Sequence, residues 1–302
     1  MTSLDARVAH SGALSEVEPP DDDADVALLV RRALQSRFVP DATLVCWNVA
    51  GRLRRQAVQA ERVTALSPDI VCLQEVIAGA VGPWTKHLTE AGLDDVRLAE
   101  LPAAGGRDRP LLTLVASRCE QERVAVEDVP WPERVLATRL ASLEVVNVHS
   151  PVSSKPGLAK VLTHEAVHAH LTGGCGPRLL CGDLNTPRRE HPDGRVWTFA
   201  RDRYGRLRAE RGERWDAAEL ALIKGLEDRG FRDAFRSLHG LEHREPSWVW
   251  QRWDGGYRLD HLIVSDEVEV PVCGYLHQWR AEGLSDHSPL VAHIRWSSKK
   301  PG

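Results

Sequence analysis

Short apolar segments rich in Val and Leu recur along this 302-residue chain, with amphipathic segments between several of them. The apolar segments are mostly continuous rather than alternating with polar residues, which predicts strands that are covered on both faces. We expect seven such strands, at residues 43–50, 69–76, 111–117, 142–150, 178–185, 258–265 and 289–296. Apolar residues recur at helical spacing at residues 52–66, 158–171 and 216–229. Strands that alternate with helices predict an α/β layer architecture.

The ends of the chain and one internal connection stand outside this pattern. Residues 1–24 are polar and acidic, which predicts a disordered tail with little to bury. Residues 25–38 have helical spacing and predict a short amphipathic helix. We see no repeat, and no linker-like stretch follows residue 40, so we assign residues 25–302 to a single domain. Residues 188–214 are long for a loop, and such loops are usually functional or locally disordered.

Charge and cysteine content narrow the class of protein. The net charge is −4, but seven acids and one Arg within residues 1–26 leave about +2 for the remainder, by subtraction. An acidic head on a mildly basic body is compatible with a polyanion-binding surface. The six Cys show no metal-binding spacing, and Cys46, Cys72 and Cys181 lie inside apolar segments, where Cys acts as a small hydrophobe. Because there is also no signal-peptide pattern and no apolar run near 18 residues, we expect a cytoplasmic protein without a membrane partner.

Polar side chains stand where the predicted strands end or begin. They are Asn48, Glu75, His149, Asp183, Asn185, Asp260, Asp286 and His287. In open α/β sheets ligands bind where strands end, so we expect these groups to converge on one site. Alternate residues of an extended chain point the same way, so Asp183 and Asn185 are expected to face a ligand together while Leu184 points into the core. Each residue alone is also explained by a helix cap, a turn or a satisfied histidine.

Taken together, these residues have the composition of a hard-metal phosphate site. Carboxylate and amide oxygens suit a hydrated, magnesium-like ion that keeps several of its waters. The set contains no Cys and no paired His ligands, which disfavours zinc. We therefore expect Mg²⁺ as the cofactor, with Mn²⁺ as a substitute.

Six motifs in order carry a family resemblance: WNVAG (47–51), PDIVCLQEV (68–76), VNVHSP (146–151), CGDLN (181–185), RLDHLIVS (258–265) and SDHSPL (285–290). With these motifs the chain resembles the endonuclease/exonuclease/phosphatase superfamily over roughly residues 43–296. That superfamily includes DNase I, exonuclease III-like abasic endonucleases, sphingomyelinases and inositol polyphosphate 5-phosphatases. The resemblance implies a four-layer α/β sandwich in which two mixed β-sheets pack face to face and are flanked by helices.

The resemblance also implies the roles of the strand-end residues. Asn48, Glu75 and Asp286 are similar to metal-site residues of the superfamily, with Glu75 as the principal ligand. Asp183 is similar to the group that orients or deprotonates the attacking water. Asn185 is similar to the group that holds a phosphate oxygen.

Three further residues are implied to act on the phosphate and the leaving group. His287 resembles the histidine that contacts the scissile phosphate, and Asp260 the carboxylate behind it. His149 resembles the histidine of DNase I-like members that stands near the leaving oxygen. A protonated His donates a charge-assisted hydrogen bond that strengthens as negative charge builds, and a carboxylate partner raises the pKa of His287.

Three segments favour a nuclease within the superfamily. Residues 213–238 and the Trp-rich residues 246–261 are similar to segments of exonuclease III-like enzymes. Residues 188–214 hold nine Arg against five acids. We therefore expect nucleic acid to contact Arg188, Arg189, Trp248 and Trp253. The alternative is that the Arg residues lie on a solvated loop and the Trp residues in a local core.

Two departures from the exonuclease III-like pattern weaken any expectation of abasic-site specificity. Val76-Ile77 stands where Thr-Lys usually follows the metal-binding Glu, and His149-Ser150-Pro151 resembles DNase I and its phosphatase relatives. We expect a divalent-metal-dependent phosphodiester hydrolase, a monomeric nuclease acting on DNA by water attack on phosphorus. The alternative is a phosphatase or phosphodiesterase of the same fold that acts on a small phosphorylated molecule or a lipid headgroup. A catalytically inactive binding module is disfavoured, because every expected catalytic position holds a competent residue type.

Overall fold

A computed structural model describes residues 41–101, 110–154, 157–250 and 255–296 of the chain. The tail predicted at residues 1–24, the helix predicted at residues 25–38 and the predicted substrate contact Trp253 lie outside these ranges. Among the described helices, none combines the length and the apolar character needed to cross a membrane.

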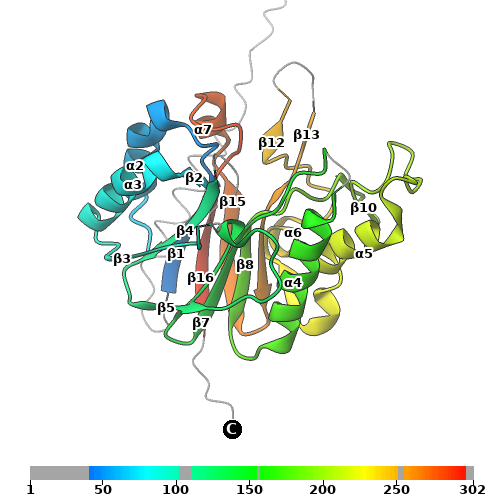
Figure 1. Ribbon diagram of the computed structural model, residues 1–302, viewed down its shortest axis with the longest axis horizontal. Coiled ribbons are helices and arrows are strands. Elements are labelled where there is room, and N and C mark those ends of the chain that lie inside the picture. Colours follow the sequence, from blue (N-terminus) through cyan, green and yellow to red (C-terminus); the bar gives the residue numbers. More distant parts are fainter. Residues whose placement is uncertain (1–40, 102–109, 155–156, 251–254, 297–302) are drawn as a thin grey trace, which may run out of the picture.

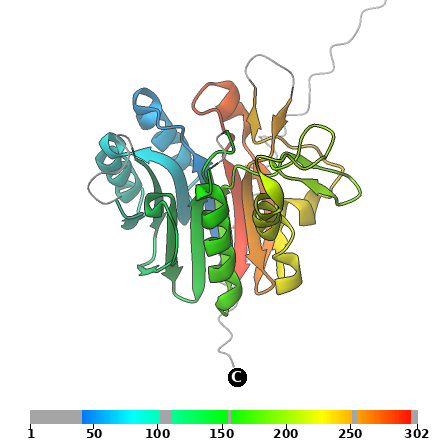
Figure 2. The same ribbon diagram turned by 45° about the vertical axis from the view of Figure 1, so that its right-hand side comes forward.

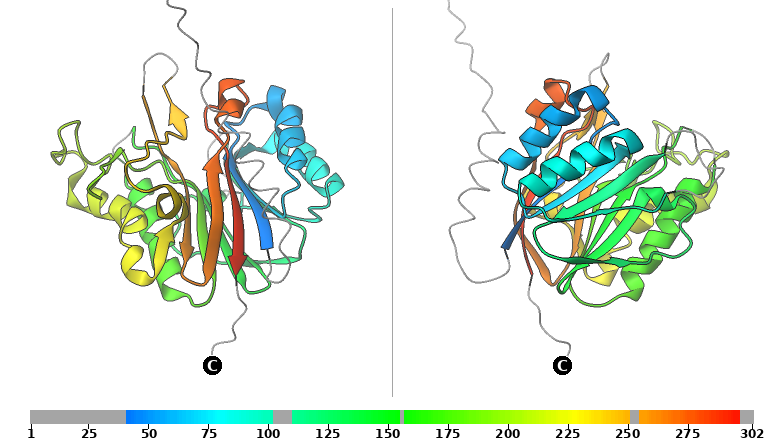
Figure 3. Two further views of the ribbon diagram at one scale, coloured as in Figure 1. Left: turned by 180° about the vertical axis from the view of Figure 1, so that it is seen from behind. Right: turned by 60° about the vertical axis from the view of Figure 1, so that its left-hand side comes forward.

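Two six-stranded mixed sheets dominate the described residues. The first sheet has the spatial order β15 (Val268–Tyr275), β16 (Leu290–Trp296), β1 (Asp41–Asn48), β2 (Ile70–Ile77), β4 (Leu111–Ser117) and β3 (Asp95–Leu98). The second has the order β11 (Phe231–Asp233), β14 (Asp260–Ser265), β8 (Arg178–Asp183), β7 (Leu143–His149), β6 (Val135–Leu140) and β5 (Gln121–Val124). Seen from behind in Figure 3, orange β15, red β16 and blue β1 lie side by side, so the two ends of the described chain meet in one sheet.

Helices cover the outer face of each sheet, which gives four layers. The described α-helices are α2 (Gln56–Ala65), α3 (Ala78–Glu90), α4 (Ala159–Gly173), α5 (Gly212–Ile223), α6 (Ala234–His239) and α7 (His277–Ala281). Figure 1 shows α2 and α3 on one side, α4 and α5 on the other, and the two sheets between them. In Figure 2, α4 runs along the outer face of the second sheet. The predicted four-layer α/β sandwich is confirmed.

Burial on both faces explains why the strands are continuously apolar. In β1, Leu44 and Cys46 belong to the core between the two sheets, whereas Val45 and Trp47 face the layer of α2 and α3. Successive side chains of a strand point to opposite faces, so a strand between two apolar layers needs apolar residues at every position. All seven predicted strands are present, with ends within two residues of the prediction.

The predicted helices differ from the observed ones at their ends. Residues 52–66 form the 3-10 turn η1 (Leu53–Arg55) followed by α2. Residues 216–229 do not form one helix: α5 ends at Ile223 and the 3-10 turn η3 (Glu227–Arg229) follows. The helix ends where the amide of Gly225 donates to the carbonyl of Leu220, five residues back, which is a pattern that terminates helices.

The long connection at residues 188–214 is not one structureless loop. It contains the hairpin of β9 (Arg189–Glu190) and β10 (Val196–Trp197), followed by short turns. A second hairpin, β12 (Trp248–Val249) with β13 (Gly256–Tyr257), precedes β14. The prediction missed the edge strands β3, β5, β11 and β15, which carry charged residues or Pro, as edge strands do, and it also missed the inner strand β6.

Strand direction brings the predicted site residues to one end of the sandwich. β1 pairs in parallel with β2, and β7 with β8, so their carboxyl ends lie at the same edges of the two sheets. Both β14 and β16 run antiparallel to these strands and therefore begin where the others end. The register places Asp183 opposite both His149 and Asp260. Figure 1 shows this end at the top, below α7 and the β12–β13 hairpin.

Candidate functional site

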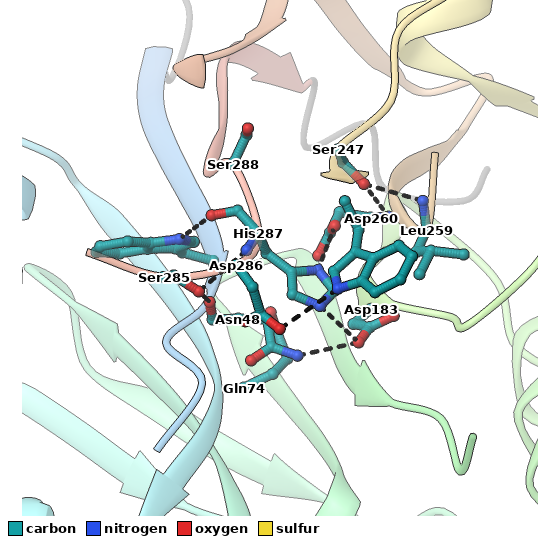
Figure 4. Close-up of polar contacts among 12 residues, drawn as sticks. Asn48, Gln74, Asp183, Ser247, Leu259, Asp260, Ser285, Asp286, His287 and Ser288 are labelled. Carbon is teal, nitrogen blue, oxygen red and sulfur yellow. Dashed lines mark hydrogen bonds and ion pairs between the residues drawn. The ribbon is translucent and has the colours of Figure 1, made fainter. Parts of the chain in front are cut away.

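A buried chain of three titratable groups occupies the centre of this end. Asp183 ends β8 and Asp260 begins β14, while His287 lies on the segment before β16. His287 Nδ1 lies 2.8 Å from Asp260 Oδ2, and His287 Nε2 lies 3.7 Å from Asp183 Oδ2. Figure 4 shows the His287 ring between the two carboxylates. Asp260 thus holds one ring nitrogen of His287, while the other ring nitrogen points to Asp183.

Backbone contacts keep His287 in this position. The indole of Trp47 donates to the His287 carbonyl at 2.9 Å, and the His287 amide donates to Ser285 Oγ at 3.1 Å. Ser285 Oγ in turn donates to the Asn48 carbonyl at 2.6 Å, which ties the histidine to the end of β1. The histidine is therefore anchored to the scaffold rather than carried on a free loop.

The electrostatics of this group favour a charged histidine. Burial opposes a charge on His287, but the carboxylates of Asp260 and Asp183 outweigh it and raise the pKa of His287 to about 10. Burial raises the pKa of Asp183 to about 7, although the charge on His287 acts in the opposite direction. His287 is thus protonated at neutral pH, and Asp183 can take up a proton close to neutral pH.

Glu75 reaches the site from a distorted part of β2. The pairing of β2 with β4 has a bulge between Leu73 and Val76, and Glu75 adopts a left-handed backbone with φ of 60°. A bulge re-aims a side chain, and here it turns Glu75 toward the strand-end groups. The side chain is 25% exposed, and its Oε1 lies 3.3 Å from His149 Nε2.

Glu75 and Asp286 have the character expected of ligands for a hard divalent cation. Burial raises the pKa of Glu75, and the negative charge of Asp286 adds to this effect. Partly exposed carboxylates that repel each other suit Mg²⁺, which binds through one or two carboxylates and keeps several of its waters. Ligand atoms of Asp183, Asp260 and His287 also lie within 4.8 Å of one another, but a charged His cannot bind a metal. The donor set therefore fits a cation at Glu75 and Asp286 better than at the buried three.

Asn48 lies between the carboxylates of Asp183 and Glu75, and its side-chain nitrogen rather than its oxygen faces them. Its Nδ2 donates to Asp183 Oδ2 at 3.0 Å and to Glu75 Oε1 at 3.3 Å. Its Oδ1 accepts from the amide of Ala50 at 2.9 Å. In this arrangement the Asn48 side chain orients Asp183 and Glu75, and Figure 4 shows the contact with Asp183. The predicted role of Asn48 as a metal ligand stays a prediction.

Asn185 does reach Asp183, but not by the geometry that the sequence predicted. Asn185 has a φ of 51°, so the chain is not extended there. Its amide N–H donates to Asp183 Oδ1, and its side-chain Nδ2 donates to Asp183 Oδ2 and to the carbonyl of Ser150. The left-handed turn, rather than strand alternation, brings the two side chains together, while Leu184 is buried as expected.

His149 and Arg134, which the sequence analysis did not predict, complete the site. His149 Nε2 lies 3.3 Å from Glu75 Oε1, 3.9 Å from Asp183 Oδ2 and 3.3 Å from Arg134 Nη1. Arg134 belongs to the 3-10 turn η2 (Pro132–Arg134), is buried, and has its guanidinium 4.9 Å from the Trp131 ring centre. Sequence analysis missed Arg134 because it precedes an unpredicted strand, β6, and carries no motif.

Trp248 makes a different contact from the one predicted. Its Nε1 donates to Asp286 Oδ2 at 3.3 Å, and its ring stacks parallel to Tyr257 with a centroid distance of 6.0 Å. Trp248 also forms an isolated β-bridge with His287. Trp248 is half-buried and donates to a site carboxylate. It therefore has a feature of the local core and also lies at the site, as the two alternative interpretations of the Trp-rich segment proposed.

Arg188 and Arg189 line a cleft whose lining begins at Pro187, four residues after Asp183 in the chain. The cleft has a volume of about 520 Å³, and Pro187, Arg244 and Tyr257 also line it. Several other Arg residues of the segment are engaged by acids, in the pairs Arg195–Asp193, Arg201–Asp216, Arg206–Asp202 and Arg214–Glu165. The local excess of Arg is therefore partly neutralised, and Arg188 and Arg189, which line the cleft, remain the better candidates for a phosphate.

A model of the endonuclease/exonuclease/phosphatase family matches residues 45–287. No curated protein matches the chain significantly. Among solved structures, an AP endonuclease from Archaeoglobus fulgidus superposes with a TM-score of 0.62 and 21% identity, covering 83% of this chain and 98% of that one. A humanized D. rerio TDP2 gives 0.59 and 17%, covering 84% and 99%. An endonuclease/exonuclease/phosphatase from Beutenbergia cavernae gives 0.58 and 15%, covering 85% and 72%. At these identities the structural likeness shows the fold.

Proposed function

The chain belongs to the endonuclease/exonuclease/phosphatase family, and from that premise we propose that it is a Mg²⁺-dependent phosphodiester hydrolase that cleaves DNA. Members of the family are phosphoric-ester hydrolases and generally use divalent metals. The observation that carries the proposal is the buried Asp183–His287–Asp260 chain beside the carboxylates of Glu75 and Asp286.

His287 supplies fixed positive charge to the phosphate. Asp260 holds Nδ1, so Nε2 is left to donate a hydrogen bond to a non-bridging phosphate oxygen. That hydrogen bond strengthens as negative charge accumulates on the oxygen in the transition state. A pKa of about 10 keeps this donor charged throughout the neutral range.

Asp183 acts as the base for the attacking water. It needs a pKa near the working pH and a water within hydrogen-bond reach, and its pKa of about 7 meets the first condition. The water gives one proton to Asp183 as its oxygen bonds to phosphorus, and the bond from phosphorus to the leaving oxygen breaks. Asn48 and Asn185 hold Asp183 through both of its oxygens, which fixes the direction of proton transfer.

The remaining polar groups act on charge and position. A divalent cation held by Glu75 and Asp286 would neutralise charge on the phosphate and the leaving oxygen. His149 Nε2 lies 3.3 Å from both Glu75 Oε1 and Arg134 Nη1, and His149 and Arg134 offer donors to a second phosphate oxygen or to the leaving oxygen. Mn²⁺ would substitute for Mg²⁺ because it accepts the same oxygen ligands.

DNA is the proposed substrate for two reasons. Arg188 and Arg189 line a cleft that also contains Tyr257, and the stacked pair of Trp248 and Tyr257 offers an aromatic platform next to Asp286. One of the similar structures is that of an AP endonuclease. The protein is proposed to act without an obligate protein partner.

A small phosphorylated molecule or a lipid headgroup is the second candidate, because His149-Ser150-Pro151 resembles the phosphatase side of the superfamily. The deciding experiment is a Mg²⁺-dependent screen on single-stranded, double-stranded and abasic DNA, RNA, and simple phosphomonoesters and diesters. Binding of a polynucleotide weakens steeply with salt, by a slope of about −0.9 per neutralised phosphate, whereas binding of a small ester does not. Hydrolysis confined to small esters, with a flat salt dependence, would replace the nuclease assignment by the phosphatase one.

A further inference from the structure

A buried ion pair lies directly beneath the turn that carries Asn185. Lys160 of α4 and Glu219 of α5 are each 1% exposed, with Nζ 2.8 Å from Glu219 Oε1. Lys160 Nζ also donates to the carbonyl of Asn185 at 2.6 Å and to Ser153 Oγ at 2.7 Å. The lysine therefore binds the backbone of the residue whose side chain faces Asp183.

Glu219 holds the surroundings of the same turn. Its Oε2 accepts from Thr186 Oγ1 at 2.6 Å and from the Phe199 amide at 2.8 Å. Its Oε1 also accepts from the indole of Trp215 at 2.6 Å. The two side chains thus join the segment after β7, the turn after β8 and the 188–214 segment through one buried contact.

Stability alone is a weak reason to bury this pair. Taking two charges out of water costs as much as or more than their attraction returns, and apolar residues of similar size often serve the fold as well. Asn185 has a left-handed backbone, which Asn tolerates better than most residues but which still costs free energy that surrounding contacts offset. Lys160 supplies the contact to the carbonyl of that residue, and Glu219 supplies the contact to the residue that follows it.

We propose that Lys160 and Glu219 are positioning residues for the hydrolysis: they hold the Asn185–Thr186 backbone so that the Asn185 amides stay against Asp183. The inference rests on the proposed function, since it assigns the pair a role in that reaction. Neither side chain touches substrate in this assignment; both act through the geometry of Asn185 and Asp183.

The test replaces the pair as a unit, so that no unpaired charge is left buried. Lys160→Met/Glu219→Gln is compared with the unchanged protein on bis(p-nitrophenyl) phosphate with Mg²⁺, and amide hydrogen exchange of residues 183–187 is measured on both. We expect kcat to fall about 10²-fold, the cost of displacing a group near the chemistry by about 1 Å, with KM nearly unchanged. We expect exchange at Asn185 and Thr186 to rise about tenfold while the β8 core stays protected.

Arg214→Met is the matched control, because Arg214 forms an exposed ion pair with Glu165 between the same two helices. It should change neither kcat nor exchange at residues 183–187, since exposed pairs contribute little. If the double variant does not fold, Thr186→Val removes the contact to Glu219 without removing a charge, and should lower kcat about fivefold.

The outcomes separate this inference from the proposed function. A folded double variant with unchanged kcat and unchanged exchange at residues 183–187 overturns the positioning role, as does an unchanged Thr186→Val where the double variant is unfolded. A loss of melting temperature in proportion to the loss of kcat, with exchange raised throughout the chain, would also overturn it in favour of a structural role. If the unchanged protein hydrolyses no phosphoester, the proposed function fails. Hydrogen exchange at residues 183–187 that is the same in the double variant would then overturn the positioning role independently of activity.

Discussion

Asp260→Asn tests the electrostatic core of the site, because it removes the charge beside His287 while keeping a side chain of the same size. Asp260 Oδ2 lies 2.8 Å from His287 Nδ1, and both groups are buried. A carboxylate this close to a titratable group shifts its pKa by about 1 to 3, so we expect the pKa of His287 to fall by that amount. Each change of 1 in the pKa corresponds to about 1.4 kcal/mol less free energy in favour of the charged ring.

The assay for Asp260→Asn is an NMR titration of the His287 ring together with the pH dependence of kcat. In the unchanged protein His287 has a pKa of about 10, so the alkaline limb of the rate profile should lie well above neutrality. In the variant both the ring titration and the alkaline limb should move to lower pH by the same amount. Asp266→Asn, at an exposed carboxylate just past the end of β14, is the control and should move neither. An unchanged ring titration in Asp260→Asn would refute the assignment of Asp260 as the source of the charge on His287.

The same pair makes a prediction for stability. The pKa of His287 is higher in the folded chain than the value of about 6.5 expected when unfolded. Its contribution is therefore complete below about pH 6.5 and is lost as the pH rises toward 10. From the same change in the pKa of His287, Asp260→Asn should lower the free energy of unfolding by about 1.4–4 kcal/mol at neutral pH, and by less as the pH approaches 10. Urea unfolding at a series of pH values measures this difference.

Three further substitutions test separate parts of the site. Glu75→Gln should raise the Mg²⁺ concentration for half-maximal activity at least about tenfold, and an unchanged magnesium titration would exclude Glu75 as a ligand. Trp248→Phe keeps the ring against Tyr257 but removes the donor to Asp286, so kcat/KM should fall about fivefold; equal activity would assign Trp248 to packing alone. Arg189→Ala should weaken DNA binding and make the slope of log K against log salt concentration less negative by about 1. A slope equal to that of the unchanged protein would exclude Arg189 from the phosphate contacts.

The sequence allowed the strand-end residues to be located because their positions follow from strand direction. Asn48, His149 and Asp183 end parallel-paired strands, and Asp260 begins a strand antiparallel to them, so a correct reading of the strands was sufficient to predict that they meet. The core strands were readable because both of their faces are buried and every position must be apolar.

The residues that sequence analysis missed depend on contacts that no local pattern encodes. Arg134 lies in a 3-10 turn, and Lys160 and Glu219 lie on the buried faces of α4 and α5, where charged residues break the helical apolar pattern instead of marking a site. The left-handed backbone at Glu75 was also invisible, because the bulge and the contacts around it impose that conformation rather than residue type. Reading the strands therefore located the strand-end groups of the site but not the neighbouring side chains that contact them.

The central claim is that this chain hydrolyses phosphodiesters with a divalent cation and with Asp183 as the base. The most direct measurement is cleavage of DNA by the unchanged protein and by Asp183→Asn, each with EDTA and after addition of Mg²⁺ or Mn²⁺. The account predicts that chelation abolishes cleavage, that either metal restores it, and that a folded Asp183→Asn is slower by about 10²–10⁴-fold at every metal concentration. Cleavage that survives thorough chelation, or near-normal turnover by Asp183→Asn, would contradict it.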